Sequence, residues 1–449
     1  MGKKIYSIAI FVGLMLGHFM IQGKELEQHK LASWAKSELL TAQVSGFIET
    51  ESMKDLHSPI ERQQFNQIVE VLKRHCRQIG LEEQDIAQSV LDVGTREQVL
   101  KSYYKVIKGF HGPIHLEDDA MSYMKQAQVI KGDEKGNLRL EEPCTVQDAI
   151  LFATRIMEDL YKQTGAGAKG FMWQVSDEDN TVYLLGTIHL GREEMYPLNS
   201  QLNEILESVD QIAVEVDFNN KREQVYFDQK QRYLDGTSLK EHLDETTYTR
   251  TVEAFKHYSL SEKEVNSYKP WALANQLSAL NVQGGKKQTI QTALPSPDLY
   301  IYTKAHLNHK DILELEGYRF QADLFDSLDE GDQIEYLKTQ LDVFERPDEE
   351  VNQNEHVVEQ WVRQFVAGDI EAFTASYGKD DALGQEDPLV KLLFKDRDQH
   401  MTDKIVGYLE DEEDANYLVT VGAGHMIGKT GIISQLQKLG YTIQIIKGE

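Results

Sequence analysis

Two short stretches of this chain place a histidine just after an apolar, strand-like run. Gly186-Thr187-Ile188-His189 follows the first run and Gly422-Ala423-Gly424-His425 follows the second. A glycine at the end of a strand permits a tight turn and the close approach of another group. If both strands belong to one sheet, the two imidazoles meet in one pocket, where histidines commonly bind a metal ion or carry protons.

The residues around these motifs predict an α/β domain at 171–449. Period-two alternation and short apolar runs indicate strands, and stretches with apolar residues at helical spacing separate them. We expect a mixed, largely parallel sheet that is flanked by helices. The expected strands are 171–175, 181–188, 211–218, 311–315, 417–421 and 441–446.

The residues that precede this domain predict an all-α module at 24–164. Apolar residues recur there at helical spacing, as in Phe65, Ile68, Val69 and Leu72. The glycine-rich run at 165–170 has the composition of a flexible linker, so we place a domain boundary in it.

Residues 1–23 resemble a secretory signal or a membrane anchor. Lys3 and Lys4 precede an apolar run that reaches Ile21, which is the order of a basic region and an apolar region in such signals. The pattern predicts export, with the protein outside the cell, in the cell wall or anchored on the outer face. It leaves cleavage of the segment open.

The two cysteines, Cys76 and Cys144, have two interpretations. In an exported protein they can form a disulfide. They can equally be two small side chains buried in a core. Because neither lies near the histidine motifs in the sequence, cysteine catalysis is disfavoured.

The charge balance excludes some partners. The chain has 74 acidic and 47 basic residues, a formal net charge of −27, and no basic patch stands out. Nucleic acid and anionic lipid surfaces are therefore unfavourable partners.

Two glutamates are placed at the ends of predicted strands, where the sites of open parallel sheets lie. Glu215 interrupts an apolar run, and a carboxylate buried in such a run is costly unless it is paired or binds a metal. Asp217 shares its predicted face and is an alternative, as is a solvent-facing edge strand. Glu316 follows the strand at 311–315.

Asp298 and Arg397 are further candidates for binding a substrate. Asp298 follows Pro295 and Pro297, and its alternative role is to cap a helix. Arg397 can bind a carboxylate or phosphate with two parallel hydrogen bonds, or it can form an ordinary surface ion pair. The chain lacks the His-Glu-x-x-His, Gly-x-Ser-x-Gly and Walker motifs, which disfavours serine hydrolases and nucleotide-binding enzymes.

The N-terminal module resembles surface-layer homology (SLH) repeats, which attach exported proteins to cell-wall polymers. One copy includes Trp34-Ala35-Lys36, Gly46-Phe47-Ile48 and residues 59–65, and a weaker copy covers residues 128–149. The wall-binding motif of such repeats is altered here to Glu61-Arg62-Gln63-Gln64 and Thr145-Val146-Gln147-Asp148. The resemblance implies a cell-wall polymer as a possible partner, and a generic helical spacer is the alternative.

Residues 171–446 resemble the TraB/GumN family, which includes the Tiki proteases. The resemblance implies a fold similar to the erythromycin-esterase type and, for Tiki members, metal-dependent proteolysis with manganese or cobalt. The family's motif histidines correspond to His189 and His425 and its glutamate to Glu215. Asp398 and Gly317-Tyr318 depart from the family pattern. The matching segments are Trp173-Gln174-Val175, residues 182–191, Tyr196-Pro197-Leu198, residues 214–217, Lys269-Pro270-Trp271, Asp298 with Tyr302, Leu315-Glu316, Arg397-Asp398, Met401 and residues 421–425.

Together these features predict an exported, metal-dependent hydrolase that acts on peptides. A divalent ion (manganese, cobalt or zinc) would be held by His189, Glu215 and His425, and Glu316 or another carboxylate would accept a proton from water. Two alternatives stay open. One is capture of a peptide or cell-wall fragment without catalysis, and the other is a histidine-based esterase that needs no metal.

Overall fold

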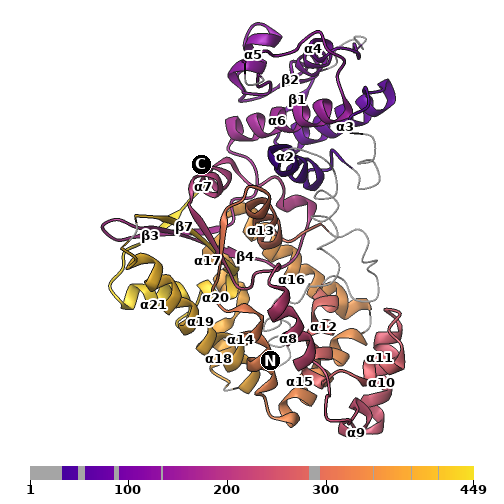
Figure 1. Ribbon diagram of the computed structural model, residues 1–449, viewed down its shortest axis with the longest axis vertical. Coiled ribbons are helices and arrows are strands. Elements are labelled where there is room, and N and C mark those ends of the chain that lie inside the picture. Colours follow the sequence, from indigo (N-terminus) through magenta and orange to yellow (C-terminus); the bar gives the residue numbers. More distant parts are fainter. Residues whose placement is uncertain are drawn as a thin grey trace. The chain divides into compact units, whose positions relative to one another are not determined.

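The computed structural model describes residues 33–48, 56–84, 91–132, 135–282, 294–346, 348–385, 387–412 and 414–448. Within them the chain forms two compact units, which are described separately (Figure 1). One contains Lys169–Arg192 and Ile205–Lys447, and the other contains the described part of Ile21–Ala168 together with Glu193–Glu204. The predicted signal at 1–23 lies outside the described residues. In the described ranges no helix has the length and apolar character needed to cross a membrane.

A six-stranded sheet forms the centre of the larger unit, in the order β6-β5-β7-β4-β3-β8. The pairs β4–β7, β7–β5 and β5–β6 are parallel, whereas β3 is antiparallel to both of its neighbours. The predicted α/β class with a mixed, largely parallel sheet is therefore confirmed. The strands are β3 (Phe171–Ser176), β4 (Thr181–Thr187), β5 (Gln211–Val214), β6 (Asp311–Glu314), β7 (Asn416–Gly422) and β8 (Ile443–Ile446).

Strands β4 and β7 carry the two histidine motifs and lie side by side in the middle of the sheet. Leu184 and Leu185 of β4 and Val419 of β7 are fully buried, as expected of strands that are covered on both faces. Thr187 pairs with Gly422 in the parallel register, so both motifs leave the sheet at the same level.

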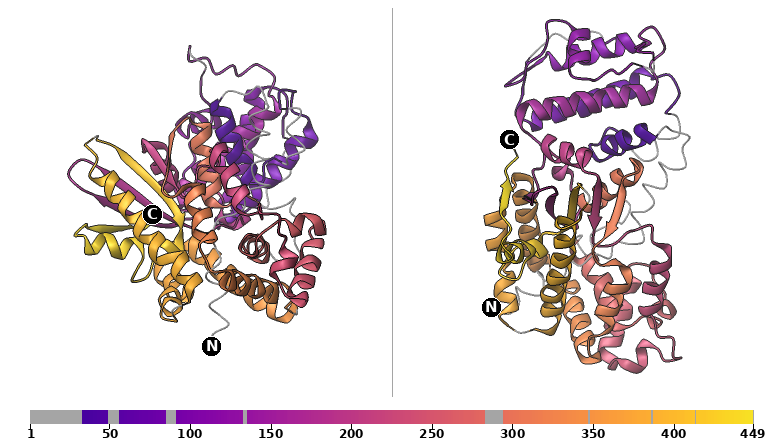
Figure 2. Two further views of the ribbon diagram at one scale, coloured as in Figure 1. Left: turned by 60° about the horizontal axis from the view of Figure 1, so that its bottom comes forward. Right: turned by 60° about the vertical axis from the view of Figure 1, so that its left-hand side comes forward.

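Helices cover the sheet, and α19 packs against both α20 and α21 near the end of the chain (Figure 2). Asn199 caps α7 by accepting a hydrogen bond from the Leu202 N–H at 2.9 Å. The helices that follow β4 are α7 (Ser200–Ser208), α8 (Lys221–Lys230), α9 (Leu239–His242), α10 (Glu245–Lys256), α11 (Glu262–Asn266), α12 (Pro270–Val282), α13 (Pro297–Leu307), α14 (Gly317–Asp326), α15 (Glu330–Phe344), α16 (Asp348–Ala367), α17 (Ile370–Tyr377), α18 (Lys379–Leu383), α19 (Pro388–Leu409), α20 (Ala423–Met426) and α21 (Ile432–Lys438).

Five strands differ from the sequence prediction by one or two residues at an end, and one differs by more. The strand expected at 211–218 ends at Val214, so Glu215 lies just beyond β5 instead of inside a strand. Strand β7 is followed by the short helix α20, which contains His425. Strand alternation therefore does not decide the direction of the Glu215 side chain. The hydrogen bonds of its carboxylate fix that direction.

The smaller unit is mainly helical, as the sequence predicts, with one short antiparallel pair of strands. Three of its helices begin with the same capping box, at Glu61, Thr95 and Thr145. Backbone pairing of Pro59 with Thr145 and of Thr95 with Pro143 joins these helix starts. The elements are α2 (Ser33–Val44), α3 (Arg62–Gln78), β1 (Glu82–Glu83), α4 (Arg96–Ile107), β2 (Phe110–His111), α5 (Ala120–Gln126), α6 (Val146–Thr164) and the 3₁₀ turn at Glu193–Met195.

The helix start at Thr95 has the same capping box as the starts at Glu61 and Thr145. The sequence indicates repeats at the Glu61 and Thr145 starts, and Thr95-Arg96-Glu97-Gln98 begins α4 in the same way. The resemblance to SLH repeats and the binding of a wall polymer stay predictions.

The predicted linker at 165–170 is held by backbone hydrogen bonds. Gly165 ends α6 in the left-handed conformation with a φ of 63°. The Lys169 and Gly170 N–H groups donate to the carbonyls of Val366 and Phe365. The division between the two compact units falls between Ala168 and Lys169, within this segment.

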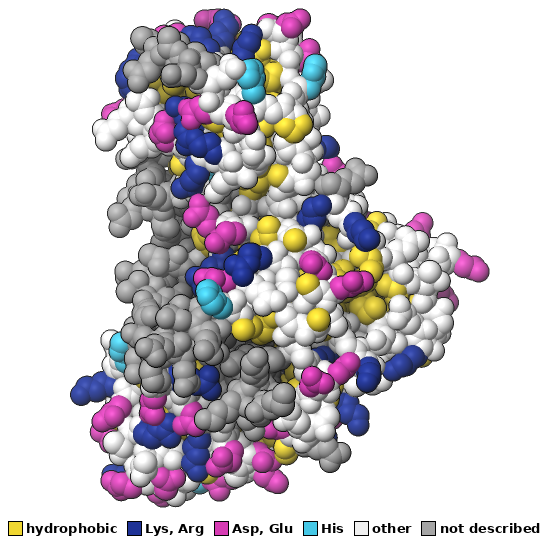
Figure 3. Space-filling view, turned by 180° about the vertical axis from the view of Figure 1, so that it is seen from behind, with side chains coloured by type: hydrophobic (Ala, Val, Ile, Leu, Met, Phe, Trp, Pro, Cys, Tyr) yellow, Lys and Arg dark blue, Asp and Glu magenta, His cyan; other side chains and the backbone are white. Residues whose placement is uncertain are grey.

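Figure 3 shows one face of the molecule, on which acidic and basic side chains are interspersed. The larger share of acidic residues over the whole chain leaves it with its net charge of −27.

The structure favours the second interpretation of the two cysteines, because Cys76 and Cys144 are free and buried. Burial raises the pKa of both thiols to about 12, so almost no thiolate forms near neutral pH. We expect neither thiol of the native protein to react with a thiol-specific disulfide reagent at mildly alkaline pH. Both should react after denaturation without a reductant, and the absence of free thiols then would show that a disulfide exists.

Candidate functional site

Four of the residues that the sequence singles out lie beyond the carboxyl ends of neighbouring parallel strands. His189 follows β4, Glu215 follows β5, Glu316 follows β6 and His425 follows β7. This is the edge at which open α/β sheets form their sites. The strand order brings together segments that are far apart in the chain.

His189 lies between two carboxylates. Its Nδ1 is 3.2 Å from Oδ2 of Asp298 at the start of α13, and its Nε2 is 3.5 Å from Oε1 of Glu215. Burial alone lowers the pKa of His189, but the charges of Asp298 and Glu215 outweigh it and raise the pKa to about 10. In this arrangement His189 is therefore an imidazolium that bridges two carboxylates.

Both oxygens of Glu215 are hydrogen-bonded. Oε1 accepts from the Gly422 N–H at 2.8 Å, and Oε2 accepts from Nη2 of Arg397 at 3.0 Å. Burial raises the pKa of Glu215, but His189 and Arg397 outweigh it and hold the pKa well below its usual range. A glycine is needed at position 422, because a Cβ there would lie 2.9 Å from Nε2 of His189 and would crowd the imidazole beside Glu215.

Arg397 joins the two glutamates. Its Nε and Nη2 both donate to Glu316 at 2.7 Å, in addition to the bond from Nη2 to Glu215. Gln321 donates to Glu316 Oε2 at 2.9 Å, so both oxygens of Glu316 are engaged. Arg397 is fully buried, and its Nη1 has no hydrogen-bond partner among the described residues.

The second histidine belongs to a separate row of buried groups. His425 Nδ1 lies 2.7 Å from Oδ1 of Asp398, and Nζ of Lys379 donates to Oδ2 of Asp398 at 2.6 Å. Asp398 follows Arg397 in α19, so one helix turn supplies a partner to Glu215 and a partner to His425.

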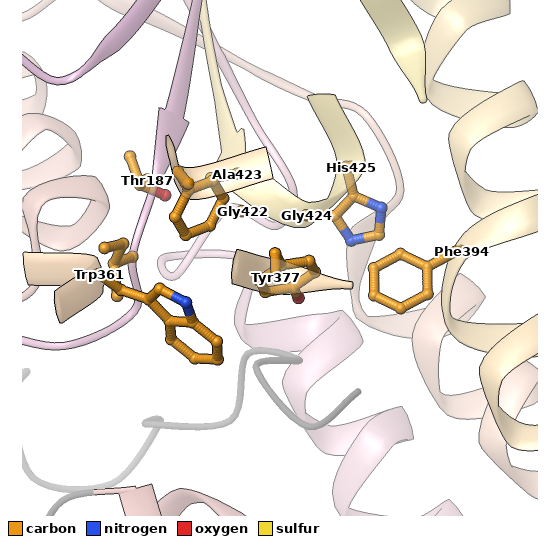
Figure 4. Close-up of a pocket in the computed structure, with 10 residues that line it drawn as sticks. Thr187, Trp361, Tyr377, Phe394, Gly422, Ala423, Gly424 and His425 are labelled. Carbon is orange, nitrogen blue, oxygen red and sulfur yellow. The ribbon is translucent and has the colours of Figure 1, made fainter. Parts of the chain in front are cut away.

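A small pocket with aromatic walls lies beside His425 (Figure 4). Trp361 of α16, Tyr377 of α17 and Phe394 of α19 line it, together with the Gly422 and Gly424 backbone. The cavity measures about 20 Å³, which is room for about one water molecule or one methyl group. His425 therefore faces surroundings that are largely apolar and nearly filled.

The donor chemistry of the site fits a divalent ion. In both histidines Nδ1 is held by a carboxylate, Asp298 or Asp398, and this is how metal-binding imidazoles are commonly oriented. However, the described residues contain no group of three histidine, cysteine or acidic side chains already close enough together to hold an ion. An ion at His189 and Glu215 would replace the proton that these groups now share.

The sequence indicated six of these residues and missed others. His189, Glu215 and Asp298 are brought together, as are Glu215, Glu316 and Arg397. Asp298 is not the N-cap of α13, because Ser296 occupies that position. The Asp298 carboxylate instead contacts His189. Asp217, the alternative to Glu215, instead accepts a hydrogen bond from the Tyr302 hydroxyl at 2.6 Å. The sequence analysis missed Tyr377 and Lys379, because no motif or break in the apolar pattern marks either residue as part of a site.

The raised pKa of His189 gives a pH dependence for the metal-free protein. The ordinary pKa is 6.5 and the folded value is about 10, so the folded state retains a proton that the unfolded state loses in between. The free energy of unfolding should therefore have its full positive contribution from His189 below pH 6.5 and fall toward pH 10, by at most about 1.4 kcal/mol per pH unit. Chemical denaturation in the presence of a chelator measures this slope.

Two variants identify the group responsible for this slope. His189→Gln should flatten it, whereas His257→Gln at an exposed position should leave it unchanged. An equal slope in His189→Gln and the native protein would contradict the assignment.

A curated relative described as a "Metalloprotease TIKI homolog" from Nematostella vectensis is 21% identical over 327 residues, which cover 62% of this chain and 67% of the relative. No solved structure is significantly similar to the chain. The sequence model of the TraB/PrgY/gumN family matches residues 171–445, which are more than half of the chain. The chain therefore belongs to the TraB/PrgY/gumN family.

Proposed function

We propose that this protein is an exported, metal-dependent hydrolase that cleaves peptides. The observation that carries the proposal is the pair of carboxylate-anchored histidines at one sheet edge, with Glu215 beside one of them. The similarity to a protein described as a metalloprotease points the same way. His189, Glu215 and His425 would hold the ion, which we expect to be manganese, cobalt or zinc.

The formal charge of the buried cluster supports a divalent ion. Four carboxylates (Asp298, Glu215, Glu316 and Asp398) face two basic groups, Arg397 and Lys379. With both basic groups charged and both histidines neutral, the cluster has a formal charge of −2, which a divalent ion would neutralise. A buried net charge of this size is unfavourable without compensation.

A bound ion lowers the pKa of water and polarises a carbonyl group. The residues of the chain supply the other functions. Glu215 lies 3.5 Å from Nε2 of His189, and we assign to it the acceptance of a proton from water and its transfer to the leaving amine. Glu316 accepts two hydrogen bonds from Arg397 and one from Gln321, and we assign to it the holding of Arg397.

Arg397 is proposed to stabilise the substrate. Its Nη1 is buried without a partner among the described residues, and such a donor is costly unless it gains an acceptor. A substrate carbonyl oxygen, which gains negative charge when water attacks, is a suitable acceptor. The sequence suggested that Asp298 contacts the substrate. Because its carboxylate contacts Nδ1 of His189, we instead assign to it the orientation of that ring.

The metal dependence is tested with the histidine variants. His189→Ala and His425→Ala should each lower the rate of peptide cleavage at least about 100-fold, because each removes a ligand of the ion. Exhaustive chelation should abolish cleavage, and manganese or cobalt should restore it in the native protein but not in the variants.

The exposed variant His257→Ala is the matched control and should remain active. Full activity after chelation would overturn the proposal in favour of a metal-independent esterase-like site. A peptide that is bound in one equivalent and released intact would indicate capture without catalysis.

The role of Arg397 is tested with Arg397→Lys. Lysine keeps the positive charge but cannot hold both glutamates and a substrate oxygen with one planar group. We expect kcat to fall about 10- to 1,000-fold with a small change in KM, as for the loss of one donor to a developing oxyanion. A change confined to KM would instead indicate a contact made equally in the ground state.

A further inference from the structure

Lys379 is a buried cation to which the proposed function gives no role. It is the first residue of α18, and only 2% of its surface is exposed. Burial lowers the pKa of its ammonium group, and the carboxylate of Asp398 opposes this shift. A charged group in such a position is costly unless its hydrogen bonds are satisfied, so the identity of its partners indicates what it does.

Two of the three hydrogen bonds of Lys379 reach the backbone beside His425, and the third reaches Asp398 of α19. Nζ donates to Oδ2 of Asp398 at 2.6 Å, to the Gly424 carbonyl at 2.8 Å and to the Ile427 carbonyl at 3.0 Å. These two carbonyls lie on either side of His425 in the chain. The Asp398 carboxylate in turn accepts from His425 Nδ1 at 2.7 Å. One ammonium group therefore contacts the backbone on both sides of the histidine and the carboxylate that orients its ring.

Neighbouring residues strengthen the same attachment. The Lys429 N–H donates to Oδ1 of Asp380 at 2.9 Å. Gly428 has a φ of 83°, and a Cβ there would lie 2.9 Å from that carboxylate and 3.3 Å from Cδ of Lys379. The glycine that follows the histidine motif is thus required by the close approach of Lys379 and Asp380. The Lys379 ammonium also lies 4.8 Å from the centre of the Phe394 ring, which lines the pocket beside His425.

We propose that Lys379 is a positioning residue for His425: its ammonium group fixes the 424–427 backbone and orients Asp398, so that His425 keeps Nδ1 bonded to Asp398 and presents Nε2 to the site. The inference rests on the proposed function for its catalytic consequence. The orientation of the ring can be measured without any activity.

Lys379→Met is the primary test variant, because methionine has similar length and no charge. The matched control is Lys429→Met, which removes the same charge from an exposed side chain nearby. In the double variant Lys379→Met/Asp398→Asn neither buried partner is charged, and the amide oxygen at position 398 still accepts from His425 Nδ1.

The first measurement is the imidazole nitrogen spectrum of the metal-free, 15N-histidine-labelled protein, with the His425 signal assigned by its loss in His425→Gln. The native protein and Lys429→Met should show His425 as one tautomer with the proton on Nδ1. Lys379→Met should show a second tautomer or a broadened signal, and the double variant should restore the single form. An unchanged His425 signal in Lys379→Met would overturn the proposal.

The second measurement is Co²⁺ affinity by titration, together with peptide cleavage. Lys379→Met should bind Co²⁺ about 10- to 100-fold more weakly and lose kcat by a similar factor with little change in KM, as is typical when the group that orients a ligand is removed. Native affinity and kcat in Lys379→Met would contradict the inference. If the single variant does not fold, recovery of folding and affinity in the double variant supports it, and no recovery contradicts it.

The two proposals fail in different ways. A native protein that neither binds Co²⁺ nor cleaves peptides contradicts the hydrolase proposal. The imidazole spectrum still decides whether Lys379 sets the tautomer of His425.

Discussion

The site depends on the carboxylate of Glu215. One oxygen accepts the N–H of Gly422 at the end of β7, and the other accepts Arg397 from α19. The same carboxylate faces His189 beyond β4. A single side chain therefore connects the ends of three strands and a helix, and it can do so only because Gly422 leaves space for the imidazole. A buried carboxylate with these partners stays ionised and keeps the surrounding cations in place.

Charge compensation organises the rest of the site in two rows. In the first, Asp298, His189, Glu215, Arg397 and Glu316 alternate in sign. In the second, Lys379 and His425 both contact the carboxylate of Asp398. Arg397 and Asp398 are consecutive in α19, so the two rows meet on one helix. Removing one member of such a row leaves its partner buried and unpaired, which costs more than the net energy of the pair.

This organisation links stability to function. Groups that orient each histidine through Nδ1 leave Nε2 for a ligand, and they also compensate buried charge in the folded chain. Under the proposed function, an ion would therefore compete with the proton that His189 holds between two carboxylates. The small aromatic pocket beside His425 gives that side of the site largely apolar surroundings, in which electrostatic interactions are stronger than in water.

The sequence by itself determined the α/β class, most strands, the paired Gly-x-x-His motifs and the position of Glu215, Glu316 and His425 near strand ends. These follow from local periodicity and from glycines that precede polar groups. Only the tertiary structure decided that β7 lies between β4 and β5, that Asp298 binds His189 and that Arg397 is shared by two glutamates. It also revealed Lys379, whose helix is unremarkable in sequence. The reason is physical: a buried charge is defined by its partners, and these come from segments whose proximity no local pattern records.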